Sequence, residues 1–129
     1  MPKGIDKKLD DAWSLLVKLK AGMKCEYCGK TTTLNSHHIY SRSKRSTRWL
    51  PDNGVCLCVS HHTFNSGFSA HKTPLEFIDW LIKYEGEEFV DTLRDKANLM
   101  WKPHKHEKEE LLTYLQERIR CFEGYEDYK

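Results

Sequence analysis

Two pairs of residues have the spacing of zinc ligands. Cys25 and Cys28 are separated by two residues, and Cys58 and His61 repeat this spacing further along the chain. Two thiolates from one turn, with a thiolate and an imidazole from another, make the closed tetrahedral shell of a structural zinc ion. Because the protein would fill all four positions, this zinc would brace the fold. Catalytic chemistry, if present, must lie elsewhere.

A second group of polar residues lies between and beside these pairs. It consists of His37, His38, Asn53 and His62. Consecutive residues of a strand point to opposite faces, so only one of His37 and His38 is expected to meet a given site unless the strand is distorted.

The order of these residues resembles the HNH nuclease family. The resemblance rests on His37-His38-Ile39, on Asn53 and on the stretch from Cys58 to His62, and it covers about residues 24–66. The flanking zinc pairs are similar to those of the zinc-containing, phage-type branch. The resemblance implies a ββα-metal unit, two short strands and a helix that hold one divalent cation. It also implies an enzyme, a metal-dependent DNA endonuclease or nickase that hydrolyses phosphodiester bonds.

The same resemblance assigns roles by position. His38 would be the general base, Asn53 would hydrogen-bond that base and hold its ring, and His37 and His62 would bind the catalytic cation. The candidate cations are Mg²⁺, Mn²⁺, Ni²⁺ and Zn²⁺, and an all-histidine pair favours the borderline metals over Mg²⁺. The roles of His61 and His62 could be exchanged.

Two positions depart from the family. The second residue of the later zinc pair is usually Cys, where this chain has His61. Many members carry a further histidine four residues after the position of His62, where this chain has Ser66. The next histidine is His71, after an insertion that contains Gly67. His71 is therefore a candidate for contact with the catalytic metal or with a phosphate.

A basic segment, residues 41–48, lies between the proposed base His38 and Asn53. Cations mixed with hydroxyl groups suit contacts to phosphates, which position a nucleic acid without reading its sequence. We expect the partner to be DNA, including branched or nicked DNA, and a branched substrate would require two active sites and hence a dimer. Trp49 could stack on a base, but the interpretation we favour is that it anchors the segment in the core. The DNA-binding candidates are Arg42, Lys44, Arg45 and Arg48.

Helices are expected to surround this unit. A length of 129 residues fits a single α+β domain, with an N-terminal helical part at 1–23, a zinc and HNH core at 24–72 and a helical part at 73–129. Apolar spacing predicts a first helix at 5–21, and helices at about 73–85, 87–100 and 107–122. Thr73 and Glu76 would form a capping box, and Pro103 would end the third helix. The later helices should pack against one another and the first.

Composition narrows the compartment and the partner. No apolar run is long enough to cross a bilayer and no signal peptide is visible, so we expect a reducing cytoplasm, including that of a phage-infected bacterium. Five cysteines there indicate metal binding or catalysis rather than disulfides. Residues 1–70 hold 11 Lys and Arg against 5 Asp and Glu, whereas residues 71–129 hold 10 against 14. The basic part is the one expected to face DNA.

Two other cysteines and two other functions complete the expectations. Cys56 is expected in the core, and Cys121 on the apolar side of the last helix as a buried, inert thiol. The alternative to an enzyme is a non-catalytic zinc module that binds DNA or a protein partner. A redox switch built on Cys25 and Cys28 is disfavoured because Cys58 and His61 complete a metal shell.

Overall fold

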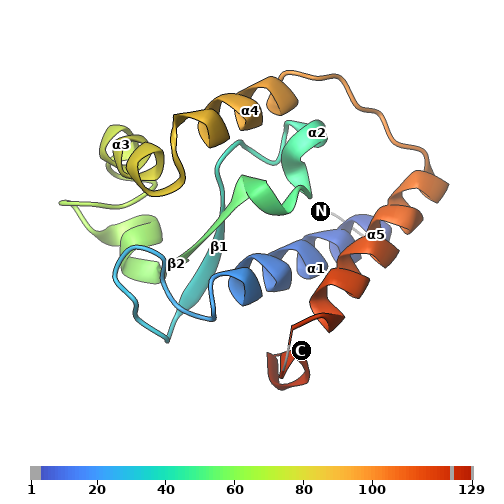
Figure 1. Cartoon of the computed structure of the whole chain (residues 1–129), viewed down its shortest axis with the longest axis horizontal. Coiled ribbons are helices and arrows are strands. Elements are labelled where there is room, and N and C mark those ends of the chain that lie inside the picture. Colours follow the sequence, from blue (N-terminus) through green and yellow to red (C-terminus); the bar gives the residue numbers. More distant parts are fainter. Residues whose placement is uncertain (1–3, 123, 129) are drawn as a thin grey trace.

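The computed structural model describes residues 4–122 and 124–128 and has an α+β fold, as the sequence predicts (Figure 1). Its α-helices and strands are α1 (Ile5–Lys20), β1 (Leu34–His38), α2 (Arg45–Arg48), β2 (Gly54–Cys58), α3 (Pro74–Glu85), α4 (Glu87–Ala97) and α5 (Lys105–Arg120). Short 3-10 turns cover Pro51–Asn53 and Tyr125–Tyr128, and a single π-helical turn covers Ser60–Phe64. Both described strands thus lie within 24–72, the part predicted to be the zinc and HNH core.

The sheet consists of β1 and β2, paired antiparallel with Ser36 opposite Cys56 and His38 opposite Gly54. Its two faces contact different elements. On one face Ser36 donates a 2.7 Å hydrogen bond from Oγ to the Ser14 carbonyl of α1. On the other face the His37 ring packs against Phe77 of α3, with ring centroids 5.2 Å apart. The alternation expected for a strand therefore separates His37 from His38.

The core is divided into two clusters of buried side chains. In the first, α1 packs against α5 and the α2 region, with Leu9, Trp13, Leu16, Trp49, Cys56 and Leu115 among its members. In the second, α3 and α4 pack over the other face of the sheet, with Val55, Leu57, Phe68, Phe77, Leu81 and Val90 among its members. The expectation that the later helices pack against one another and the first holds for α3 with α4 and for α5 with α1, which lie side by side in Figure 1. The helices α3 and α4 belong to the second cluster and not to the one that contains α1.

Two helix ends differ from the prediction, and in both a residue outside that helix hydrogen-bonds to a group at that end. No capping box forms at Thr73, because its hydroxyl is used by Ser69: Oγ1 accepts the Ser69 N–H at 2.8 Å and donates to the Ser69 carbonyl at 3.0 Å. Helix α4, which was expected to reach Met100, ends at Ala97. The Ala97 carbonyl accepts a 3.3 Å hydrogen bond from Ser46 Oγ of α2.

The last helix begins at Lys105, two residues earlier than predicted, and the Glu107 carboxylate accepts the backbone N–H of His104 at 3.1 Å. Such a contact satisfies one of the free N–H groups at a helix start. Among the described residues, no helix has both the length and the apolar character that a membrane crossing requires.

Candidate functional site

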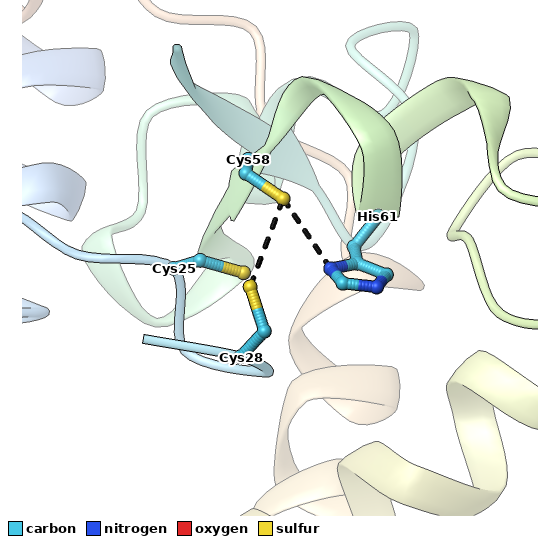
Figure 2. Close-up of side chains that lie close together, drawn as sticks. All are labelled: Cys25, Cys28, Cys58 and His61. Atoms are coloured by element: carbon cyan, nitrogen blue, oxygen red, sulfur yellow. Dashed lines mark hydrogen bonds between the residues drawn. The ribbon is translucent and has the colours of Figure 1, made fainter. Parts of the chain in front are cut away.

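The four predicted zinc ligands converge. One ligand atom from each of Cys25, Cys28, Cys58 and His61 lies within 4.8 Å of all the others. The Sγ atoms of Cys28 and Cys58 are 3.9 Å apart, and Cys58 Sγ is 3.3 Å from Nδ1 of His61 (Figure 2). Ligands about 2.0–2.3 Å from a tetrahedral zinc ion are roughly 3.4–3.8 Å apart. The donor set and its spacing fit zinc, so this cluster could bind the ion.

The backbone brings the two pairs together. The cysteine turn is closed by hydrogen bonds from Gly29 N–H to the Cys25 carbonyl and from Cys25 N–H to the Lys30 carbonyl, both 2.8 Å long. Gly29 has φ = +80°, a conformation that favours glycine. Glu26 then ties the turn to β2: its N–H donates to the Cys56 carbonyl and its Oε2 accepts the Cys56 N–H, both at 2.8 Å.

The two thiols of the turn differ in acidity. Burial acts to raise the pKa of Cys25, but backbone N–H groups near its sulfur outweigh burial and lower the pKa. The pKa of Cys28 is raised, by partial burial and by the neighbouring thiols of Cys25 and Cys58. A thiolate is the zinc-binding form of cysteine, so the N–H groups around Cys25 support metal binding.

A second cluster contains three imidazoles, from His37, His62 and His71. His62 Nε2 lies 3.1 Å from Nδ1 of His37 and 3.1 Å from Nε2 of His71. Side-chain exposure increases from His37 to His62 to the exposed His71, so the cluster opens to solvent on one side. Nitrogen ligands about 2.0–2.1 Å from a metal ion are roughly 2.9–3.4 Å apart, so these residues could hold a divalent cation and leave coordination positions free.

The structure brings together the predicted ligands His37 and His62 and adds His71, which the sequence indicated more weakly. The π-helical turn, closed by a 2.8 Å hydrogen bond from Asn65 N–H to the Ser60 carbonyl, sends His61 to the cysteines and His62 to the imidazoles. The loop then folds back, with the N–H of His71 donating to the His62 carbonyl at 3.1 Å. His61 therefore lies with the cysteines and His62 with the imidazoles, which is the grouping that was predicted first.

Residues around the imidazoles favour their neutral, metal-binding form. Burial is the largest cause, and together with the neighbouring His62, His71 and His38 it lowers the pKa of His37 to about 3. Burial and the neighbouring His71 also lower the pKa of His62. The side-chain amide of Asn35 lies 3.1 Å from Nδ1 of His62. A histidine that binds a metal through Nε2 donates its Nδ1–H to an acceptor, so Asn35, which sequence reasoning missed, would have to present its Oδ1 to His62 in place of the Nδ2 that lies there.

His38 lies on the opposite face of β1, outside the imidazole cluster. Its Nε2 is 3.0 Å from the Arg48 carbonyl, and its ring stacks on Trp13 with centroids 3.7 Å apart and an interplanar angle of 8°. A carbonyl oxygen only accepts hydrogen bonds, so Nε2 carries the proton and the lone pair of the neutral ring is on Nδ1. Burial is the main cause that lowers the pKa of His38, opposed by the Arg48 carbonyl.

Asn53 was expected to hydrogen-bond the ring of His38, but its side chain bonds to another residue. Its fully buried side chain instead bridges the backbone of Tyr40: Oδ1 accepts the Tyr40 N–H at 2.7 Å and Nδ2 donates to the Tyr40 carbonyl at 3.0 Å. The Asn53 carbonyl also accepts the Ile39 N–H at 3.1 Å. Asn53 therefore fixes the chain just after His38, and its contribution to the base is through the backbone.

The basic segment is divided by its contacts. Lys44 and Arg45 are exposed. Arg48 is only 8% exposed and forms two hydrogen bonds to Asp10, and Arg42 also binds Asp10, at 3.0 Å. The guanidinium of Arg48, predicted to contact DNA, is instead held by the half-buried carboxylate of Asp10 and is not exposed as Lys44 and Arg45 are.

Three further expectations have clear outcomes. Trp49 is buried and Cys56 is fully buried, as predicted, and burial raises the pKa of Cys56 to about 12. Cys121 is exposed, contrary to the prediction, because it follows the last residue of α5.

Comparisons with protein-family models, curated proteins and solved structures found no match for this chain.

Proposed function

We propose that this protein is a metal-dependent DNA endonuclease or nickase of the HNH type. The observation that carries the proposal is the three-imidazole cluster, which lies beside a zinc-binding cluster and opens to solvent. Its residues are similar in order to the HNH motif, and the antiparallel pair β1–β2 followed by a helical turn is similar to a ββα-metal unit.

The imidazole cluster suits a catalytic cation better than a structural one. His37, His62 and His71 supply three ligands, and three protein ligands with free positions are typical of catalytic metal sites. Imidazole ligands favour Mn²⁺, Ni²⁺ or Zn²⁺ over Mg²⁺. A bound cation would act as a Lewis acid that neutralises charge developing on the phosphate.

His38 supplies the general base in this proposal. Since its Nε2–H is directed to the Arg48 carbonyl, its Nδ1 is the nitrogen that takes a proton from water. His38 is the last residue of β1, and the side chain of the preceding His37 lies on the other face of the strand. A phosphodiester lying across this end would reach His38 from one side and the imidazoles from the other.

Phosphate binding is assigned to the exposed cations Lys44 and Arg45 at the start of α2. Arg48 at the end of that helix supplies the carbonyl that holds His38. Lys44 and Arg45 would therefore bind the DNA backbone one helical turn away from the residue that holds the general base His38. Because these contacts are electrostatic, we expect DNA affinity to fall steeply as the salt concentration rises.

Cleavage of supercoiled plasmid in the presence of Mn²⁺, Ni²⁺, Zn²⁺ or Mg²⁺ tests the proposal. We expect nicking by the wild-type protein and a loss of about 100-fold or more in His38→Ala, because general base catalysis typically contributes 10²–10⁴-fold. His106→Ala, which changes an exposed histidine of α5, is the matched control and should cut at the wild-type rate.

Two outcomes would count against the proposal. Nicking at the wild-type rate by His38→Ala would reject the assignment of the base. A wild-type protein that binds DNA but cuts no plasmid with any of the four metals would favour the alternative, a zinc module that binds DNA or a protein partner without catalysis.

A further inference from the structure

Helix α1 directs two polar side chains toward the proposed base. Asp10 and Trp13 are three residues apart, so they lie on the same face of the helix. The sequence gives α1 only the pattern of a packing helix. Their contacts with the segment that holds His38 indicate a second role, and this inference rests on the proposed function.

Both oxygens of the Asp10 carboxylate accept hydrogen bonds from the basic segment and from Trp49, which follows it. Its Oδ1 accepts hydrogen bonds from Trp49 Nε1 at 2.8 Å and from Arg48 Nε at 3.1 Å. Its Oδ2 accepts from Arg48 Nη2 at 2.9 Å and from Arg42 Nη2 at 3.0 Å. The contact with Arg48 is thus bidentate, which restricts direction as well as distance.

These bonds fix one particular peptide group. The carbonyl of Arg48 belongs to the peptide bond between Arg48 and Trp49, and both of these residues donate to the same carboxylate. The two anchors hold the residues on both sides of this peptide, which restricts the position of its carbonyl. This carbonyl is the group that faces Nε2 of His38, at 3.0 Å. Asp10 therefore holds the acceptor that selects the tautomer of His38.

Trp13 restricts the same imidazole from a second direction. Its ring lies parallel to the His38 ring at 3.7 Å, which blocks rotation of the imidazole toward α1. The indole is itself held, because Nε1 donates to the Leu50 carbonyl at 2.8 Å. One helix thus fixes both the plane of the imidazole and its hydrogen-bond partner.

We propose that Asp10 and Trp13 are positioning residues for His38. Asp10 acts through the Arg48–Trp49 peptide to keep the proton on Nε2 and the lone pair on Nδ1, and Trp13 keeps the ring in its plane. Two guanidinium groups, from Arg42 and Arg48, balance the one negative charge of Asp10. Its effect on His38 is therefore mainly geometric.

The test compares Asp10→Asn with Asp11→Asn. Asp11 is the next residue, is exposed, and makes a 3.1 Å ion pair with Lys7 on the surface, so it is a matched control. Both variants are first checked for zinc content and circular dichroism. For plasmid nicking we expect kcat to fall about tenfold or more in Asp10→Asn without a rise in KM, because a misplaced base slows chemistry and not binding. Asp11→Asn should retain both values.

A second measurement does not depend on cleavage. The ¹⁵N chemical shifts of His38 in zinc-loaded protein report which ring nitrogen carries the proton. We expect the Nε2–H tautomer in the wild-type protein and in Asp11→Asn, and a mixture of tautomers in Asp10→Asn. If the wild-type protein cuts no DNA, the proposed function fails, but these shifts still decide whether Asp10 positions His38.

Arg48→Lys serves if Asp10→Asn does not fold. It keeps the positive charge but loses the bidentate geometry of the guanidinium, so we expect the same mixture of tautomers. A folded Asp10→Asn or Arg48→Lys protein in which His38 retains the single Nε2–H tautomer would overturn the proposal. So would a folded Asp10→Asn protein with the kcat of the wild type.

Discussion

Two neighbouring histidines, His61 and His62, belong to two different clusters, each of which could hold a metal ion. The π-helical turn Ser60–Phe64 makes this possible, because His61 contacts Cys58 and His62 contacts His37. Such turns are rare and are frequently found at functional sites. At the scale of single residues, one turn of backbone therefore contributes a side chain to each of the two clusters.

A carboxylate near the cysteine turn gives a prediction about stability. Partial burial is the largest cause that raises the pKa of Glu85, followed by repulsion from the nearby Glu26. We therefore expect Glu85→Gln to stabilise the fold at pH 7, where the wild-type carboxylate is charged, by about 0.5 kcal/mol or less at this exposed position. Thermal unfolding of the two proteins measures the gain.

The sign of the pH dependence follows from the raised pKa. The folded protein binds the Glu85 proton more tightly than the unfolded chain does, so the penalty of the charged form disappears as the pH falls through the folded pKa. The gain in Glu85→Gln should shrink as the pH is lowered from 7 toward the ordinary glutamate value of about 4.3. An exposed control, Glu110→Gln, should show no such trend, and a gain that stays constant would contradict the account.

The residues that sequence reasoning located are those with local spacing. The ligands of the zinc-binding cluster come in two pairs, each within one turn, so their spacing predicts the site. His71 was a weaker candidate, because only the return of the loop after Gly67 brings it to His62. Asn35 and Asp10 could not be located, since a lone polar residue on a strand or helix has no pattern that indicates its partner.

At the scale of elements, α1 is both a core helix and a support for the site. Leu9 and Leu16 are fully buried in the cluster shared with α5, while Asp10 and Trp13 hold the segment around His38. The period of apolar residues predicted the helix and its buried face. This period could not predict that Asp10 and Trp13 support the site, because their partners lie about 30–40 positions further along the chain.

The contact of α1 with β2 predicts a destabilising substitution. A Cβ atom added at Gly54 would overlap Cγ2 of Val17 and lie 2.9 Å from Cζ2 of Trp13. We expect Gly54→Ala to lower the free energy of unfolding by about 1–3 kcal/mol, because an overpacked core forces side chains or backbone to shift. Urea unfolding measures the change.

Gly67→Ala is the control for this substitution. There the nearest atom is the Oδ1 of the exposed Asn65, at 3.3 Å, and no helix must move. A Gly54→Ala protein as stable as the wild type would mean that α1 does not approach the sheet as closely as described.

At the scale of the whole molecule, the cluster of Cys25, Cys28, Cys58 and His61 joins parts of the chain that are far apart in the sequence. It connects the loop after α1 to the end of β2 and to the π-helical turn (Figure 2). A structural zinc ion in a small peptide contributes about 10–16 kcal/mol of binding free energy. We therefore expect this half of the molecule to depend on zinc more than the packing of α1 against α5 does.

Replacing one ligand tests this dependence. Cys28→Ser should lose the zinc ion and lower the free energy of unfolding by several kcal/mol, as measured by elemental analysis and urea unfolding. Cys121→Ser removes an exposed thiol outside the cluster and should change neither quantity. Retention of one zinc ion per chain in Cys28→Ser would show that the four residues do not form the site.

The most direct test of the account is the number of metal ions that each chain binds. Elemental analysis followed by titration with Mn²⁺ or Ni²⁺ should find one tightly held zinc ion and one exchangeable divalent ion in the wild-type protein. In His71→Ala the zinc ion should remain, and the affinity of the exchangeable site should fall by about tenfold or more, because one of three ligands is lost. A wild-type chain that binds zinc at one site and no second divalent ion would contradict the account.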